Sequence, residues 1–191
     1  DTPNARFSDH LRLGGRPIFS SLFTGIVLLL GLVQLYLSVR GWTMGALGLT
    51  ILTAFDASVT GFEQIFLDGR WWSPWSSQFV HAGPMHLFPN LAVVGYTGYR
   101  VERALGASAT AVVVASSIFF GGLAVGIYSS LPVMGSSIAG YGLLGSVIVV
   151  GFRFGDTIPS HHQRFYGYGN VLLFALLFVS GLRIENASML G

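Results

Sequence analysis

Residues 104–152 carry no charged side chain, and this run constrains the fold more than any other feature of the sequence. A helix that crosses a membrane needs about 20 mostly apolar residues, so the run is too long for one crossing. Over the whole chain 52% of the residues are hydrophobic and 9% are charged, whereas about a quarter of the residues in soluble domains are charged. The sequence therefore predicts an all-α membrane protein, a helical bundle with several spans.

Five stretches are predicted to be membrane helices. The turn signal YSSLPVMGSS divides the uncharged run into two of them, and the complete set is 17–39, 84–101, 107–128, 136–152 and 168–183. Residues 41–75 begin as a short apolar stretch but then contain Asp, Glu and Arg. They are predicted to form an interfacial loop whose Trp side chains lie at headgroup depth, with a sixth span as the alternative. No internal repeat is visible, so residues 1–191 are predicted to form a single domain.

The arginines predict the orientation in the membrane. Three lie in the N-terminal tail 1–16 and four in the loops between spans 2 and 3 and between spans 4 and 5, against three on the opposite side. Because positive residues favour the inner face, the N-terminus is predicted to be cytoplasmic in a multi-pass protein of the cell membrane. The net charge of +2 is too small and too scattered to indicate a nucleic-acid partner, and the oligomeric state stays open.

Two polar residues lie near the start of the second predicted span, in the stretch PMHLFPNL. His86 and Asn90 are four residues apart and therefore share one helix face. Polar groups at this depth are costly without partners, so they are candidates for function. An interhelical hydrogen bond is an equally good explanation of both residues on chemical grounds alone.

The stretch MGSSIAGYGLLG at 134–145 begins another predicted helix. Ser137, Tyr141 and Gly145 recur at four-residue spacing and so line one face. A serine at a helix N-terminus lies near unpaired N–H groups, which are able to stabilise an oxyanion. Packing of small residues is the alternative, but both predicted helices begin on the outer side, so Ser137, His86 and Asn90 are expected to converge in one outward-facing cavity.

No metal or cofactor is predicted. Cys is absent, and His81 and His86 are five residues apart with no acidic residue nearby. Zinc peptidases instead place two His four apart on one helix face with a Glu between them.

Taken together, these motifs resemble the rhomboid family of intramembrane serine proteases. The resemblance covers about residues 70–191 and is carried by HAGPMHLFPN, GSSIAGYGLLG, GYRVERALG and a Trp nine residues before His81. It implies that Ser137 is the nucleophile of a Ser–His dyad and that His86 and Asn90, with the backbone N–H of Ser137, stabilise the oxyanion. It further implies that Tyr141 packs on the catalytic His, and that four residues have structural roles: His81, Trp72, Glu102 and Gly145.

The sequence departs from the family pattern at three points. Ser73 stands where the family has Arg after the loop Trp, and Ile138 stands where Gly commonly follows the nucleophile. The base is expected to be a His in a His-x-x-Gly setting on a sixth span, and no such element occurs in these 191 residues. The chain is therefore expected to be a fragment that is inactive alone.

Two functions follow from the resemblance. In the first, the parent protein is a serine endopeptidase that cleaves transmembrane segments of single-span membrane proteins, with membrane lipid around it. In the second, which Ile138, Ser73 and the missing His favour, it is an inactive pseudoprotease that binds membrane helices.

Overall fold

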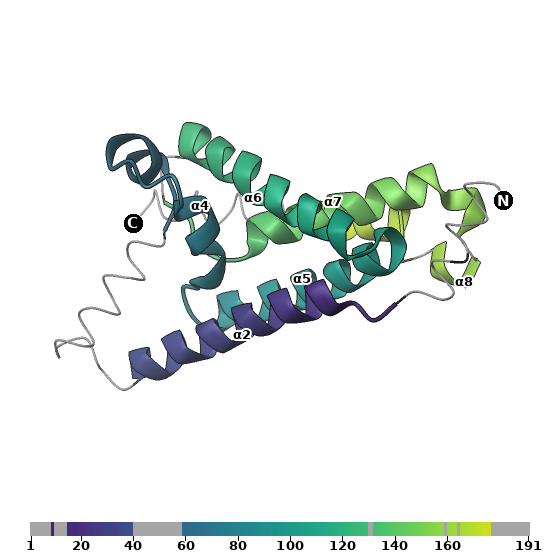
Figure 1. Ribbon diagram of the computed structural model, residues 1–191, viewed down its shortest axis with the longest axis horizontal. Helices are drawn as coiled ribbons and strands as arrows, with labels where there is room; N and C mark the ends of the chain where they lie inside the picture. Colours follow the sequence, from purple (N-terminus) through teal and green to yellow (C-terminus); the bar gives the residue numbers. More distant parts are fainter. Residues whose placement is uncertain are drawn as a thin grey trace.

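The computed structural model describes residues 9, 15–39, 59–129, 132–158, 160–163 and 165–176. Four long helices dominate it (Figure 1): α2 (Ile18–Val39), α5 (Pro84–Leu105), α6 (Ala107–Tyr128) and α7 (Ser137–Arg153). Residues 168–176 are also helical. The short elements are the π-helix η1 (Glu63–Leu67), α4 (Ser73–Ser76), the 3-10 helices η2 (Ser77–Phe79) and η3 (Gly155–Thr157), and α8 (Ser160–Gln163). In the described part of the chain the only β-pairing is an isolated antiparallel bridge between Thr60 and Val133.

The long helices overlap the ranges predicted for the first four spans, although α5 continues past the predicted end at 101 to Leu105. The fifth range is helical as far as residue 176. Its remainder, 177–183, lies outside the described residues, as does 40–58 of the predicted interfacial loop and most of the tail 1–16. The part of that loop that is described is more structured than expected: η1 forms within it and α4 begins at Ser73, before its predicted end.

Two of the described helical segments are long and apolar enough to cross a membrane, Ile18–Leu37 and Ala107–Tyr128. Helix α7 is apolar but shorter. Helix α5 is less apolar than the other three long helices because polar and charged side chains occur along it. The uncharged run thus forms α6 and α7, as the turn signal predicted.

Helix α5 lies at the centre of the bundle and packs against α7, α2 and α6, while α6 also packs against α7 and α4. The core between them is built from aliphatic side chains, chiefly Val94, Val101, Val114, Ile118, Leu143 and Val147. Small residues bring the elements close together. A Cβ on Gly122 of α6 would clash with the ring of Pro74, so glycine at this position allows α4 to lie directly on α6.

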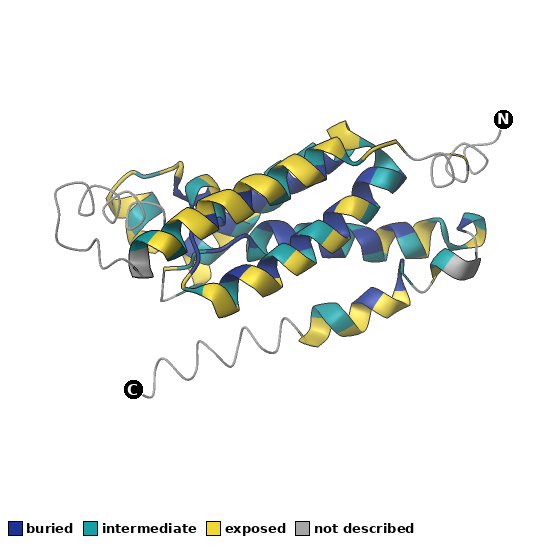
Figure 2. Ribbon diagram, turned by 90° about the horizontal axis from the view of Figure 1, so that it is seen from below, coloured by how far each residue is buried: buried dark blue, intermediate teal, exposed yellow. Residues whose placement is uncertain are grey.

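The surface of the bundle is strongly apolar. Figure 2 shows exposed residues along the outer face of α2, where Ile18, Leu22 and Leu29 are each 61% exposed. Soluble monomers rarely leave such a continuous apolar face in water. Polar side chains are instead buried inside, among them Ser73, Ser77, Gln78 and His81. This arrangement is that of a helical membrane protein.

Helices α2 and α5 are joined at one end by a buried carboxylate. Glu102, in the last turns of α5, accepts hydrogen bonds from the backbone N–H groups of Phe19 (2.9 Å) and Ser20 (2.7 Å). The first N–H groups of a helix have no partner within the helix. The carboxylate satisfies two of them and matches the positive end of the α2 dipole.

Candidate functional site

The N-terminus of α7 is held by a glycine in an unusual conformation. Gly135 has φ +104°, a region that favours glycine, and its N–H donates to the carbonyl of Ser77 at 2.7 Å. A Cβ at this position would lie 2.9 Å from both Cε1 and Nε2 of His86 and 3.2 Å from Nδ2 of Asn90. The side chains of α5 are therefore in contact with the residue two before Ser137, the first residue of α7.

His86 and Asn90 are linked to each other and to the preceding loop. Asn90 is buried, and its Nδ2 donates to the carbonyl of His86 at 2.9 Å. The N–H of Ala82 donates to Nδ1 of His86 at 3.4 Å. A neutral imidazole whose Nδ1 accepts carries its hydrogen on Nε2, the atom that faces Gly135. One N–H of the Asn90 amide also remains to donate, so two donors are available beside Gly135.

His81 is associated with Ser136 and not with Ser137. Its Nε2 lies 3.4 Å from the backbone N and 3.5 Å from the Oγ of Ser136, and both residues are almost fully buried. The rings of His81 and His86 meet edge to face, with centroids 5.4 Å apart. Burial, followed by the charge of His86, lowers the pKa of His81 to about 4, although the carbonyl of Phe79 opposes this shift. His81 is therefore neutral at pH 7.

The main chain at His81 is fixed by a residue that sequence reasoning did not single out. Gln34 of α2 donates through Nε2 to the carbonyl of His81 at 2.8 Å and accepts its N–H through Oε1 at 2.9 Å. This paired contact ties α2 to the loop that precedes α5. A Gln within a mostly apolar predicted span was the available signal.

Gln78 is a second residue that sequence reasoning missed. It is fully buried, and its Nε2 donates to the carbonyl of Pro74 at 2.9 Å. Its Oε1 accepts the N–H of Ala139, in the first turn of α7, at 3.4 Å. Gln78 thus connects α4 and η2 to the helix that begins at Ser137. The signal was a polar side chain in the aromatic stretch WWSPWSSQF.

Ser73 and Ile138, the two residues that depart from the family pattern, both pack against neighbouring residues in this structure. Ser73 is fully buried at the start of α4, and its Oγ lies 3.0 Å from Oγ1 of Thr60, so an arginine would not fit there without displacing these neighbours. Ile138 packs against α6, since a Cβ on Gly121 would be 2.6 Å from its Cγ2. The branched side chain of Ile138 therefore contacts α6.

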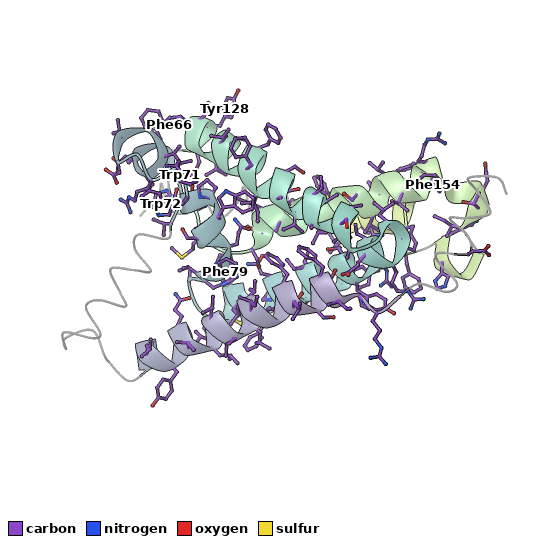
Figure 3. The ribbon with its side chains drawn as sticks, in the orientation of Figure 1. Phe66, Trp71, Trp72, Phe79, Tyr128 and Phe154 are labelled. Atoms are coloured by element: carbon purple, nitrogen blue, oxygen red, sulfur yellow. The ribbon has the colours of Figure 1, made fainter. Side chains whose placement is uncertain are left out.

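The other expected site residues are spread over the bundle. The ring of Tyr141 meets Phe174 edge to face at 5.6 Å, and a Cβ on Gly145 would meet nothing within 4 Å. Trp72 is 46% exposed and contacts Trp71 edge to face at 5.9 Å (Figure 3). Glu102 lies near the opposite end of α5 from His86. Of the expected site residues outside α7, only His81, His86 and Asn90 thus contact residues 135–136, which precede Ser137.

Metal ligands are not clustered in the described ranges, where no three His, Asp, Glu or Cys side chains form a group.

Comparison with known proteins identifies a family that this sequence matches. The family model described as Rhomboid domain matches residues 68–191. The rhomboid protease GluP of Bacillus subtilis (strain 168) is 27% identical over 136 residues, which are 71% of this chain and 25% of that protein. The chain thus spans about a quarter of the length of the curated relative. No solved structure matches the chain.

Proposed function

The chain belongs to the rhomboid family, and on this premise we propose that its parent protein is a serine endopeptidase that cleaves transmembrane segments of membrane-anchored proteins. The contact of Gly135 with His86 and Asn90 supports the proposal most directly. It sets two hydrogen-bond donors beside a loop that leads into a serine at a helix N-terminus, as an acyl-transfer site requires.

In the proposed reaction the Oγ of Ser137 attacks the scissile carbonyl carbon, and its proton passes to a His base. The carbonyl oxygen becomes an oxyanion, which the Nε2–H of His86, the free N–H of Asn90 and the backbone N–H of Ser137 stabilise. Collapse of this intermediate expels the amine, protonated by the base, and leaves an acyl-enzyme. Water then attacks the acyl carbon and releases Ser137.

The catalytic base is the one group in this reaction that still has to be assigned to a residue. His81 and His86 are already assigned to other roles in this scheme, and His162 lies beside Arg100 and Arg103 at the other end of α5. We expect the ten or so coding residues after Gly191 to contain a His followed by Gly three residues later. Tyr141 contacts Phe174 of the helical segment 168–176. Tyr141 therefore lies on the side of α7 that faces this last described segment.

The membrane arrangement is part of the same proposal. We assign five spans of an expected six to this single domain, with the N-terminus cytoplasmic and the Ser137 end of the bundle on the outer side. The proposed substrates are single-span proteins whose helices unwind near the outer face. Trp71, Trp72 and Phe66 lie together at the Ser137 end (Figure 3), where aromatic side chains suit the interface between lipid and water.

The test uses the full-length parent protein reconstituted with a transmembrane substrate. Ser137→Ala is expected to abolish both cleavage and labelling by a fluorophosphonate, because no other group forms the acyl-enzyme. Ser136→Ala is the matched control, and it is expected to retain labelling and most of the cleavage. Loss of both with Ser136→Ala alone would move the nucleophile by one residue. Cleavage that persists in both variants would refute the serine mechanism.

A pseudoprotease that binds membrane helices is the second candidate, favoured by Ile138 at the position after the proposed nucleophile. The discriminating result is a parent sequence without His-x-x-Gly after Gly191, together with binding of a transmembrane peptide and no labelling of Ser137.

A further inference from the structure

A cavity of about 150 Å³ lies at the end of the bundle opposite Ser137. It is formed by the last turns of α5, by α8 and by the chain that follows α8, close to the end where Figure 3 labels Phe154. Its lining is basic and aromatic, and it contains no Asp or Glu among the described residues: Tyr99, Arg100, Arg103, His162, Phe165 and Tyr166. This combination has no role in the proposed proteolysis.

Arg100 is the central residue of this cavity. Its Nε is buried and has no hydrogen-bond partner. The guanidinium lies 3.9 Å from the ring centroid of Tyr96 and 4.6 Å from that of Phe165. The two rings hold the cation by cation–π contacts but supply no acceptor to the buried N–H, and a buried donor without an acceptor is costly. An acceptor atom of a bound anion would satisfy this donor.

Aromatic residues also fix the surroundings of Arg100. The hydroxyl of Tyr166 donates to the carbonyl of Arg100 at 3.2 Å, and burial raises the pKa of Tyr166 although Arg100 and Arg103 oppose the shift. Arg103 donates from Nη1 to the hydroxyl of Tyr99 at 2.8 Å. The rings of Tyr96 and Phe165 position the guanidinium of Arg100 before any ligand arrives. Tyr99 does the same for Arg103, and this preorganisation reduces the entropy cost of binding.

We propose that this cavity binds a phosphate group and that the ligand is the headgroup of an anionic phospholipid. Guanidinium groups match the geometry of phosphate oxygens and offer several donors at once. The volume is many times the roughly 10–15 Å³ that one water needs on this measure, which suits a phosphate whose acyl chains stay outside along the bundle. In the membrane arrangement proposed above, on which the choice of a lipid rests, the cavity lies at a helix end on the arginine-rich side and faces the anionic lipids of the inner leaflet.

Lipid binding is measured on the purified full-length parent protein by native mass spectrometry, with titrations of phosphatidylglycerol and of zwitterionic phosphatidylcholine. The wild-type chain is expected to bind phosphatidylglycerol about tenfold more tightly than phosphatidylcholine. Arg100→Gln is expected to remove this preference, because a charge-assisted contact to phosphate is lost. Arg153→Gln is the matched control: this guanidinium lies 5.5 Å from the Phe154 ring at the same end of the bundle, but Arg153 does not line the cavity.

Each outcome of these binding measurements either supports or overturns the proposal. Equal preference for phosphatidylglycerol in wild type and Arg100→Gln overturns the proposal, as does an equal loss with Arg153→Gln, which would indicate general attraction of charge. If Arg100→Gln does not fold, Arg103→Gln carries the same expectation. Inorganic phosphate at millimolar concentration tests the source: displacement of the lipid by phosphate supports the site, while binding of phosphate without any lipid preference overturns the assignment to lipid. Binding is measured without proteolysis, so failure here leaves the proposed function standing.

Discussion

Gly135 lies directly against His86, since a Cβ on this glycine would be 2.9 Å from the Nε2 atom of the imidazole ring. Two constraints thus apply to one residue. Its φ of +104° strains any side chain, and the space a side chain needs is already occupied by His86 and Asn90. The loop before α7 therefore approaches the start of α5 this closely only because residue 135 has no side chain.

Gly135→Ala in the parent protein is expected to lower cleavage by about 100-fold, because the added methyl group displaces His86 from the oxyanion position and misplacements of 1 Å have effects of that order. The measurement is the rate of substrate cleavage per folded molecule. Gly25→Ala is the matched control, since a Cβ there meets nothing within 4 Å. Unchanged cleavage in Gly135→Ala would show that this contact does not position the site.

Asn90→Ala is expected to lower the rate by about 10²–10³ while some activity remains, because one oxyanion donor among several is lost. Asn170→Ala is a suitable control: Asn170 is also buried and also donates to a backbone carbonyl, that of Phe165 at 2.7 Å. It is expected to lose stability but to retain cleavage per folded molecule. Equal losses of rate in the two variants would indicate that Asn90 is only structural.

The long helices of this fold were predictable because each is encoded locally. The turn signal separated α6 from α7, and Pro84 marked the first turn of α5 because its missing N–H costs nothing there. The shared face of His86 and Asn90 also follows from helix periodicity. Both side chains were expected to converge with Ser137, and in the structure they contact Gly135, two residues before it. Convergence on Ser137 itself stays a prediction.

What the sequence did not predict depends on contacts between distant segments. Gln34 and His81 are 47 residues apart and Gln78 and Ala139 are 61 apart, so no local pattern indicates their pairing. The cavity beside Arg100 likewise requires the end of α5 to meet Phe165. In the sequence alone, the arginines at this end indicate only the orientation in the membrane.

The burial of His81 predicts a pH dependence of stability. The pKa of His81 falls from 6.5 to about 4 on folding, so the unfolded chain binds more protons between these values. Stability is therefore fully present above about pH 6.5 and falls as the pH drops toward 4. His81→Gln is expected to show a smaller decrease in unfolding temperature between pH 7 and pH 5 than the wild type. Equal decreases in both proteins would contradict a buried neutral His81.

The last prediction concerns Glu102, whose carboxylate binds the N–H groups of Phe19 and Ser20. Glu102→Ala leaves two donors at the start of α2 without this acceptor, and a buried donor without a partner costs about 1–3 kcal/mol. The free energy of unfolding, measured by SDS titration in mixed micelles, is expected to decrease by at least that amount. Glu102→Gln retains one acceptor oxygen and is expected to lose less. Glu63→Ala, at an exposed carboxylate of η1, is the control and is expected to be neutral. If Glu102→Ala is as stable as Glu63→Ala, the carboxylate does not join α2 to α5.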